Sequence, residues 1–428
     1  MAETGKRVLR AAAEPPRMAV TTAWGGWLGR RRAGLAAAAL AVVVAGLLAG
    51  GTSARAAQAH PALASAGRGF TAYVAGTGPH GNYVTPVNTA TNRPGKPIKA
   101  GDVAYSVAVT PDGKTAYVAD QYGNTVTPIA TATNMPGKPI KAGKGPLVIA
   151  ITPNGKTAYV VDQGFLGAPG TVTPINTATN RPGRPIKAGN TANGIVITPN
   201  GKTVYVVAFG SGTVIPISTA TNTAGKPIKV GPFPFALTVT PNGKTVYVTD
   251  SGQDGQGHMV TPIDTATNRP GKPIKVGADP QGIVVTPDGK TVYVANSLSN
   301  TVTPIATATN IPGQAIKTGV FPNRIAVTPD GKTVYVTNLD SGTVTPIQTA
   351  ANTAGKPIKI GGIGGGSPLA IAVTPDGKTV YVTNLAPHSG STVIPIRAAT
   401  NTPGKPITVG GFPVAIAFAP PAQDPNGS

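Results

Sequence analysis

Short runs of alternating apolar and polar residues, separated by turn residues, recur along most of this chain. One copy is Thr328–Asn338, T-P-D-G-K-T-V-Y-V-T-N, in which Asp330-Gly331 supplies two residues that tolerate a tight turn. The next residues, Thr333–Val336, alternate β-branched and aromatic side chains, which is typical of a strand. The stretch therefore predicts a β-hairpin.

The core T-P-[D/N]-G-K-T-[A/V]-Y-V occurs seven times, and a degenerate eighth copy lies at 69–74. Its tyrosines are Tyr117, Tyr159, Tyr205, Tyr247, Tyr293, Tyr335 and Tyr381. Each unit contains four apolar segments, a to d, which in one copy are 324–329, 333–338, 343–349 and 356–361. Four short strands at a period of about 42 to 46 residues indicate a β-propeller. We find no helical periodicity, and 44 prolines and 56 glycines would oppose it.

One family pattern resembles this repeat closely. V-T-P-D-G-K-T-V-Y-V-T-N at 327–338, with V-T-P-I at 344–347, is similar to the YVTN family of β-propeller repeats, and the similarity covers 69–420. The resemblance implies an exported protein, because many members lie at cell surfaces, including the surface layers of archaea. It implies little about chemistry, since no reaction is known for most members.

The two ends of the repeat region predict the number of blades. The first unit has segments b, c and d without a preceding segment a, whereas Val414–Pro420 is a segment a without successors. We therefore expect an all-β fold, a propeller of eight four-stranded antiparallel blades, closed by a one-plus-three seam between the chain ends. Seven blades is the alternative. Closure would remove the edge strands that an open array exposes.

Segment c contains an interior proline in every unit, for example Pro346. Proline cannot donate to a strand ladder. We expect a bulge at this position, or a segment d that pairs with only part of segment c.

The first residues follow a different pattern. Three arginines, 30–32, precede an apolar run at 35–48, and Ala57-Gln58-Ala59 has the small-x-small form of a cleavage site. We expect an export signal at 1–59, used by the Sec or the twin-arginine route, with an uncleaved membrane anchor as the alternative. A linker at 60–68, a single propeller at 69–420 and a disordered tail at 421–428 complete the expected organisation. The mature protein would be secreted or at the cell surface, a monomer, and without a membrane span.

Composition excludes some chemistry and suggests one partner class. The absence of cysteine excludes disulfides and thiolate sites. The formal net charge is +21, and most basic residues fall in the a-b turns, the c-d turns and segment d. We interpret this charge mainly as protection of the outer edges and as a source of solubility. An acidic polymer or nucleic acid bound to that face is the alternative.

All variation in loop length is expected on one face. The a-b and c-d spacings are constant, whereas the distance from the motif tyrosine to the valine of segment c varies between 9 and 13 residues. The aromatic residues outside the strands also lie in or beside the b-c and d-a connections. A rigid scaffold with variable loops is typical of a binding surface.

We therefore predict a ligand-binding face made by these connections. The candidate residues are Tyr105, Tyr122, Phe165, Phe209, Phe233, Phe321, Phe412, Arg324, His80 and His388. For Phe233, Phe321 and Phe412, packing between blades is the alternative, because they recur at one repeat position. His80 and His388 lie in loops of neighbouring blades and would be the pair for metal or acid-base chemistry. We predict no catalytic residue, metal or cofactor.

Other polar positions have simpler interpretations. Asp120, Asp162 and Asp250 follow the motif tyrosine by three residues, where the last three repeats have Asn, and we interpret them as strand-end Asx turns. We find no catalytic triad, nucleophile elbow, phosphate loop or HExxH sequence.

Three functions follow from these observations. The leading hypothesis is a non-catalytic scaffold that binds a protein or glycan partner at the cell envelope. The alternatives are a propeller hydrolase of the lactonase type, which rests on analogy of fold, and a polyanion-binding protein.

Overall fold

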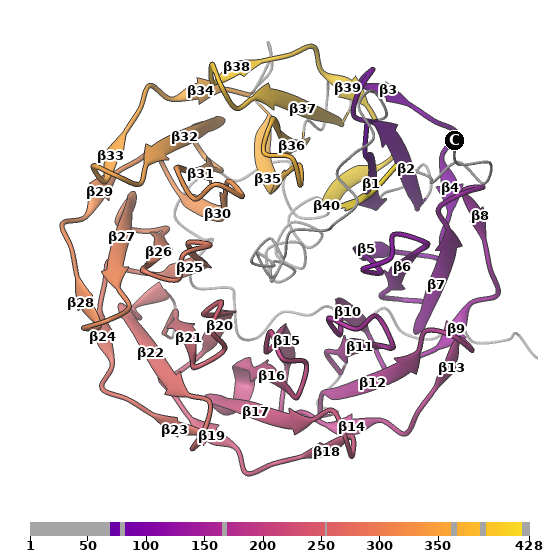
Figure 1. Ribbon diagram of the computed structural model, residues 1–428, viewed down its shortest axis with the longest axis horizontal. Helices are drawn as coiled ribbons and strands as arrows, with labels where there is room; N and C mark the ends of the chain where they lie inside the picture. The colour runs from indigo at the N-terminus through magenta and orange to yellow at the C-terminus, as the bar shows by residue number, and fades with distance from the viewer. Residues whose placement is uncertain are drawn as a thin grey trace, which may run out of the picture. The chain divides into compact units, whose positions relative to one another are not determined.

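The computed structural model describes residues 69–77, 82–164, 169–252, 255–360, 366–385 and 391–421. These residues form a ring of eight blades around a central axis (Figure 1). Each blade is an antiparallel sheet, and in every blade except the one that contains both ends of the ring the strands run from the centre outward in chain order. The predictions of an all-β fold and of eight four-stranded blades are confirmed. We number the blades 1 to 8 from the blade that contains both ends of the ring.

The innermost strand of each blade corresponds to segment a. These strands, from blade 1 to blade 8, are β40 (Phe412–Ala419), β5 (Ala104–Val109), β10 (Pro146–Ile151), β15 (Ala192–Ile197), β20 (Pro234–Val239), β25 (Pro280–Val285), β30 (Pro322–Val327) and β35 (Ser367–Val373). In blade 1, β40 pairs with β1, and Val74 lies opposite Ile416. The last strand of the chain therefore completes the first blade.

The second strand of each blade contains the motif tyrosine. These strands are β1 (Thr71–Thr77), β6 (Thr115–Asp120), β11 (Thr157–Asp162), β16 (Thr203–Ala208), β21 (Thr245–Asp250), β26 (Thr291–Asn296), β31 (Thr333–Asn338) and β36 (Thr379–Leu385). The third strands are β2 (Tyr83–Asn88), β7 (Thr125–Ala130), β12 (Thr171–Asn176), β17 (Thr213–Ser218), β22 (Met259–Asp264), β27 (Thr301–Ala306), β32 (Thr343–Gln348) and β37 (Thr392–Arg397). A single helical turn, η1 (Phe209–Ser211), precedes β17.

The fourth strand is divided into two short pieces in every blade. The first pieces are β3 (Arg93–Pro94), β8 (Met135–Pro136), β13 (Arg181–Pro182), β18 (Thr223–Ala224), β23 (Arg269–Pro270), β28 (Ile311–Pro312), β33 (Thr353–Ala354) and β38 (Thr402–Pro403). The second pieces are β4 (Ile98–Lys99), β9 (Ile140–Lys141), β14 (Ile186–Lys187), β19 (Ile228–Lys229), β24 (Ile274–Lys275), β29 (Ile316–Lys317), β34 (Ile358–Lys359) and β39 (Ile407–Thr408).

The proline of the third strand explains this division. Pro128 of β7 has no N–H to donate, and its carbonyl accepts a bond from the Gly137 N–H at 2.7 Å, just beyond β8. The outer chain then leaves the ladder and returns at Ile140, opposite Val126. Segment d thus pairs with only part of segment c, as we expected.

The core lies between the blades. A typical cluster joins Tyr117 and Val126 of blade 2 to Ile149, Val160 and Ile175 of blade 3. All eight motif tyrosines are buried, and each hydroxyl donates a hydrogen bond of 2.6 Å to an asparagine Oδ1 in the next blade. The last of these bonds, from Tyr381 to Asn92, connects blade 8 to blade 1. We call this closed series the Tyr–Asn ring.

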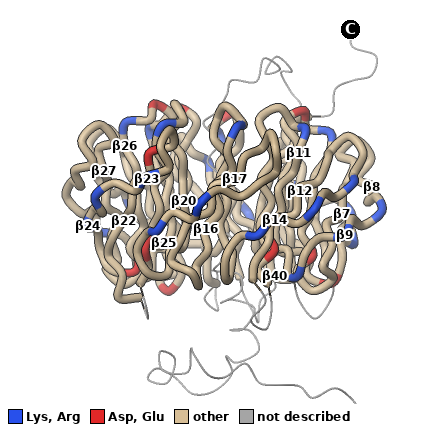
Figure 2. The backbone as a smooth tube through the Cα atoms, turned by 90° about the horizontal axis from the view of Figure 1, so that it is seen from below, with Lys and Arg blue, Asp and Glu red and all other residues tan. Residues whose placement is uncertain are grey.

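The two rims of the propeller differ. The a-b and c-d turns share one rim, because the Thr131 hydroxyl of a c-d turn bonds to the Gly113 carbonyl of the a-b turn at 2.6 Å. The b-c and d-a connections share the other rim, where the Gln121 N–H bonds to the Val103 carbonyl at 2.9 Å. We call these the turn rim and the loop rim. Figure 2 shows basic residues along the outer wall and at one rim.

Candidate functional site

The residues predicted to bind a ligand are distributed around the loop rim. Tyr122 is exposed, whereas Phe209, Phe233, Phe321 and Phe412 are half-buried. The Phe209 and Phe233 rings pack with their centroids 5.1 Å apart. Phe233 and Phe321 have positive φ values of 53° and 58°, in the d-a connections just before β20 and β30. Phe165, His80 and His388 lie outside the described residues.

Arg324 and Tyr105 are both buried on inner strands. The Arg324 Cζ lies 5.9 Å from the centroid of the Phe235 ring, two blades away. Tyr105 is three blades from Arg324, and its charge acts to raise the pKa of the guanidinium. Because burial acts more strongly, the pKa of Arg324 falls to about 10. Strands β5, β20 and β30 lie nearest the centre of the ring (Figure 1), and the contacts of Arg324 with Phe235 and Tyr105 therefore connect blades that are not neighbours.

A chain of side-chain hydrogen bonds begins at Asn323, the residue before Arg324. The Asn323 Nδ2 donates to the Gln281 Oε1 at 3.1 Å, and the Gln281 Nε2 donates to the two carboxylate oxygens of Asp279 at 3.0 and 3.1 Å. Burial raises the pKa of Asp279. Since both ends of Gln281 are engaged, this array is a polar lining of the inner strands, and it holds no nucleophile.

Bulges place these residues at the centre. In β30 the pairing passes from Pro322 opposite Asn338 to Ile325 opposite Val336, which leaves Asn323 and Arg324 outside the ladder. The Thr337 hydroxyl accepts a bond of 3.1 Å from the Arg324 N–H and so satisfies the displaced backbone. β-bulges often redirect side chains next to functional sites.

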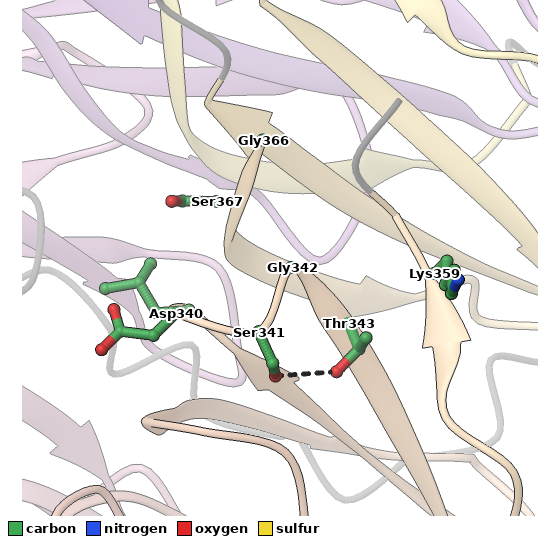
Figure 3. Close-up of a pocket in the computed structure, with 8 residues that line it drawn as sticks. Asp340, Ser341, Gly342, Thr343, Lys359, Gly366 and Ser367 are labelled. Atoms are coloured by element: carbon green, nitrogen blue, oxygen red, sulfur yellow. Dashed lines mark hydrogen bonds between the residues drawn. The ribbon is translucent and has the colours of Figure 1, made fainter. Parts of the chain in front are cut away.

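Two pockets open on the loop rim, and the smaller belongs to blade 7. Its volume is about 250 Å³, and Asp340, Ser341, Thr343 and Lys359 line it (Figure 3). The Ser341 hydroxyl accepts from the Val320 N–H at 3.1 Å and shares a bond of 3.0 Å with the Thr343 hydroxyl. This serine is therefore a structural partner of the loop and has no adjacent base to activate it.

The larger pocket lies where the connection from blade 4 meets the b-c loop of blade 5. Its volume is about 530 Å³, and it is lined by Gly231, Pro232, Asp250, Gly252, Gln256, Gly257, His258, Met259 and Pro273. This volume suits a small organic molecule. Prolines, glycines and a methionine supply most of the lining, with one carboxyl group and one imidazole among them.

Asp250 is the buried acid of this pocket. It is the last residue of β21 and is 2% exposed. The Thr261 hydroxyl donates to its Oδ2 at 2.7 Å, while its Oδ1 is buried without a hydrogen-bond partner. Burial raises the pKa of Asp250 to about 7, although the bonds from Thr261 and the Gly231 backbone act in the opposite direction. The carboxyl group can therefore give and take a proton near neutral pH.

His258 is the exposed base of the same pocket. Its Nδ1 lies 3.1 Å from the Gln256 carbonyl oxygen. Because a carbonyl oxygen can only accept, Nδ1 carries the proton in this contact, and Nε2 is left as the acceptor nitrogen. An imidazole in this form can remove a proton from water or from a hydroxyl group.

Blade 3 has an equivalent of Asp250. Asp162 ends β11, is 1% exposed and accepts bonds from the Thr171 and Thr173 hydroxyls at 3.0 and 2.6 Å. Burial raises the pKa of Asp162 to about 7 as well. In blades 6 and 7 the position is Asn296 and Asn338, whose amide nitrogens donate to the corresponding threonines.

These contacts replace the Asx turns that we expected at this position. Asp120 accepts three backbone N–H bonds, from residues 102, 103 and 123 at 2.9, 2.8 and 3.2 Å. The other side chains at this position mainly form hydrogen bonds from the end of the second strand to threonines of the third strand. Sequence reasoning therefore missed Asp250 and His258 as a pair. The sequence signal that could have found this pair is an aspartate at a position where other repeats have asparagine. In blade 5 that aspartate is followed by a long loop that contains a histidine.

Within the described residues, no group of three or more His, Cys, Asp or Glu side chains could hold a metal ion. No helix in the same part of the chain is long and apolar enough to cross a membrane. The chemistry that the described site can support is thus general acid-base chemistry by Asp250 and His258.

Comparisons with known proteins agree with the fold and bear on the chemistry. The model of the family "Lactonase, 7-bladed beta-propeller" matches residues 256–362, which is less than half of the chain. The match includes His258 and Arg324. No curated protein matches the sequence.

Several solved structures share the propeller fold. The dihydro-heme d1 dehydrogenase NirN, in complex with DHE, is 14% identical with a TM-score of 0.66, and the alignment covers 83% of this chain and 79% of NirN. Hydrazine synthase from Kuenenia stuttgartiensis is 20% identical with a TM-score of 0.55, over 72% and 96% of the two chains. A candidate 6-phosphogluconolactonase from Bacteroides uniformis is 16% identical with a TM-score of 0.52, over 68% and 97%. At these identities the likeness concerns the fold.

The leading functional hypothesis from the sequence, a non-catalytic binding scaffold, is wrong against these findings. The match to the lactonase model contradicts it and favours the alternative, a hydrolase of the lactonase type. From the sequence we considered His80 and His388 as the acid-base pair and interpreted Asp250 as a strand-end Asx turn, so Asp250 was not joined to His258. The candidate acid-base pair combines the end of β21 with the b-c loop that follows it in blade 5. What the comparisons establish for the whole chain is a β-propeller with a partial match to the lactonase family.

Proposed function

We propose that this protein is a lactonase-like hydrolase whose active site is the pocket of Asp250 and His258. One observation carries the proposal: a buried carboxyl group with a pKa of about 7 lines a pocket of about 530 Å³ beside an imidazole. The partial match to the lactonase model gives the reaction class. A carboxyl group with such a pKa exchanges protons efficiently at neutral pH.

The reaction would proceed by two proton transfers. The Nε2 of His258 takes a proton from water, and the resulting hydroxide attacks the lactone carbonyl carbon. The protonated Asp250 carboxyl donates a hydrogen bond to the substrate and gives its proton to the ring oxygen as the carbon–oxygen bond breaks. The product is an open-chain hydroxy acid. Gly231 packs closely on the Asp250 carboxyl group, since a Cβ on Gly231 would lie 2.6 Å from the Asp250 Cγ.

A matched pair of variants tests this assignment. The Asn side chains of blades 6 and 7 show that the repeat accepts asparagine at this position, so both Asp250→Asn and Asp162→Asn are expected to fold. We expect Asp250→Asn to lower kcat/KM for lactones by about 10²- to 10⁴-fold, the usual range for loss of a general acid-base group. Asp162→Asn is expected to keep the activity, because Asp162 does not line the pocket.

The assay would use a panel of five- and six-membered lactones with circular dichroism as a folding control. Equal activity of Asp250→Asn and the unchanged protein would reject the site. Absence of turnover of any lactone by the folded, unchanged protein would reject the reaction class. A His258→Asn variant should lose activity as well, because asparagine cannot take a proton from water.

We also propose that the repeats are of the YVTN type and that the protein is exported. The Tyr–Asn ring supports the first proposal by giving the repeated tyrosine a structural role in all eight blades. The second is supported by the basic and apolar pattern of residues 30–48 together with Ala57-Gln58-Ala59. Mass spectrometry of the protein from culture supernatant should show a new N-terminus at His60. Recovery of the intact chain from the cytosol alone would contradict export.

A further inference from the structure

The outer wall of the propeller carries nearly all of the net positive charge of the described residues. We define the outer wall as residues 88–99, 130–141, 176–187, 218–229, 264–275, 306–317, 348–359 and 397–408, from the end of the third strand to the end of the fourth. These ranges contain eighteen basic residues and a single acidic one, Asp264. Every one of the basic side chains is exposed. The basic residues are Arg93, Lys96, Lys99, Lys138, Lys141, Arg181, Arg184, Lys187, Lys226, Lys229, Arg269, Lys272, Lys275, Lys317, Lys356, Lys359, Arg397 and Lys405.

The charges of the outer wall have no acidic partners among the described residues. The two salt bridges in this part of the chain join Lys290 to Asp288 at 3.9 Å and Lys332 to Asp330 at 3.8 Å, both within a-b turns. Asp264 instead accepts bonds from the Thr267 N–H and hydroxyl at 2.8 and 2.7 Å. In the a-b turns, four of the seven lysines follow an aspartate by two residues, whereas the outer wall has one acidic residue for eighteen basic ones.

Edge protection accounts for only part of the charge on the outer wall. A lysine or a proline on an edge strand blocks pairing with another chain, but this accounts for the lysines and prolines of the fourth strand and not for the arginines of the outer wall. Solubility would be served at least as well by Asp and Glu. A wall with eighteen basic residues and one acidic residue is the arrangement expected where a polyanion binds.

We propose that the outer wall binds a flexible linear polyanion with phosphate or carboxylate groups. The outer strand pieces follow the whole circumference of the ring (Figure 1), and every blade contributes at least one basic residue to the outer wall. A flexible polymer can follow such a surface over several blades, whereas a rigid duplex would touch one sector. The wall ranges contain no Phe, Trp or Tyr, so the stacking platforms that bind single-stranded nucleic acid are missing from them.

Two variants of equal net charge test the proposal in the full chain. The wall variant replaces Lys226, Lys229, Lys272 and Lys275 of blades 4 and 5 by Gln. The turn variant replaces Lys114, Lys156, Lys202 and Lys244 by Gln, and all four lie exposed in a-b turns. The probes are polyphosphate, poly-glutamate, neutral dextran and single-stranded DNA of matched charge, with binding measured by fluorescence titration.

We expect polyphosphate, poly-glutamate or both to bind, and dextran not to bind. With about four ionic contacts, the affinity should fall on the order of a hundredfold between 50 and 200 mM salt. The wall variant should bind at least about tenfold more weakly, and the turn variant within about twofold of the unchanged protein. The stronger of the two polymers identifies the preferred anionic group.

Three results would overturn the proposal. Equal weakening of both variants would show that net charge alone attracts the polymer. Binding that does not change with salt would exclude ionic contacts, and tighter binding of single-stranded DNA than of polyphosphate would identify a nucleic-acid surface. None of these results depends on turnover, so the proposed hydrolase and the proposed polyanion surface can fail separately.

Discussion

The turn rim and the loop rim are built from the same eight repeats but use them differently. On the turn rim, all eight motif tyrosines donate bonds of one length, 2.6 Å, to equivalent asparagines. On the loop rim, one repeat position is Asp162 or Asp250 in some blades and Asn296 or Asn338 in others. The a-b turns also alternate between Asp and Asn, but those side chains are exposed, whereas Asp162 and Asp250 are buried and burial raises their pKa values to about 7. The comparison indicates that the first rim closes the ring and that the second holds the buried ionisable groups.

The largest expected effect concerns the pH dependence of stability. The carboxyl of Asp162 has a pKa of about 7 in the fold against 3.8 in the unfolded chain. Between these values the folded state binds more protons than the unfolded state, so stability falls as the pH rises and levels off above about 7. Asp162→Asn removes this loss. We expect the variant to gain up to roughly 4 kcal/mol over the unchanged protein between pH 5 and pH 8, measured by urea denaturation.

A turn-rim aspartate supplies the control with the opposite sign. The Thr286 hydroxyl and the Lys290 backbone lower the pKa of Asp288, which is largely exposed. Its stabilising contribution is present above its unfolded pKa and is lost as the pH falls, so Asp288→Asn should be slightly less stable at neutral pH. If Asp162→Asn and Asp288→Asn showed the same pH dependence, the contrast between the rims would be incorrect.

The second prediction concerns a close approach on the loop rim. Gly277 follows the outer strand of blade 5 and packs on Asn296 of blade 6, where an added Cβ would lie 2.8 Å from the Asn296 Cβ and Cγ. Gly277→Ala is therefore expected to destabilise the fold by about 1 to 3 kcal/mol. Gly271→Ala on the turn rim is the matched control, because its Cβ would lie 3.2 Å from the Pro262 Cγ. A thermal unfolding series that ranks Gly271→Ala as the more damaging change would contradict this packing.

The repeat pattern predicted the fold because it depends on local chemistry. The turn at Asp330-Gly331, the alternation at Thr333–Val336 and the proline of segment c each act within a few residues. The pairing of the two chain ends could also be predicted. The first unit has segments b, c and d without a segment a, and the last unit has only a segment a. These features are repeated eight times, so the pattern is strong.

The site depended on contacts that the sequence does not display. The pKa of Asp250 is set by burial beneath Gly231, which belongs to the connection from another blade. Arg324 and Tyr105 were both predicted on the loop face, but their approach across the ring follows from closure and from bulges in the inner strands. Asp250 and His258 lie in one blade, but the pocket that both residues line also needs the connection from blade 4, and no local pattern encodes that contact.

The third prediction tests whether the seam is equivalent to the other blade interfaces. Tyr293→Phe removes the bond to Asn352, and Tyr381→Phe removes the bond to Asn92 between blade 8 and blade 1. Each change removes one partly buried hydrogen bond to an asparagine that water can still reach, and should cost about 1 to 1.5 kcal/mol. We expect equal losses in guanidinium denaturation. A much larger loss for Tyr381→Phe would show that the seam depends on its Tyr–Asn bond more than the other interfaces do.

The smallest expected effect concerns the bulge that places Arg324. The Thr337 hydroxyl accepts from the Arg324 N–H at 3.1 Å, and in blade 5 the Thr249 hydroxyl accepts from the Ala236 N–H at 3.0 Å. Valine has the same shape without the hydroxyl, so Thr337→Val and Thr249→Val should each cost about 1 kcal/mol in denaturant unfolding. Both threonines end the same motif, yet only Thr337 supports the backbone of a buried arginine. Thr337→Val should therefore also expose the Arg324 amide to hydrogen exchange, while Thr249→Val leaves that amide protected. Equal protection of Arg324 in the two variants would mean that the bulge forms without the hydroxyl, and that the inner strand alone determines where this arginine lies.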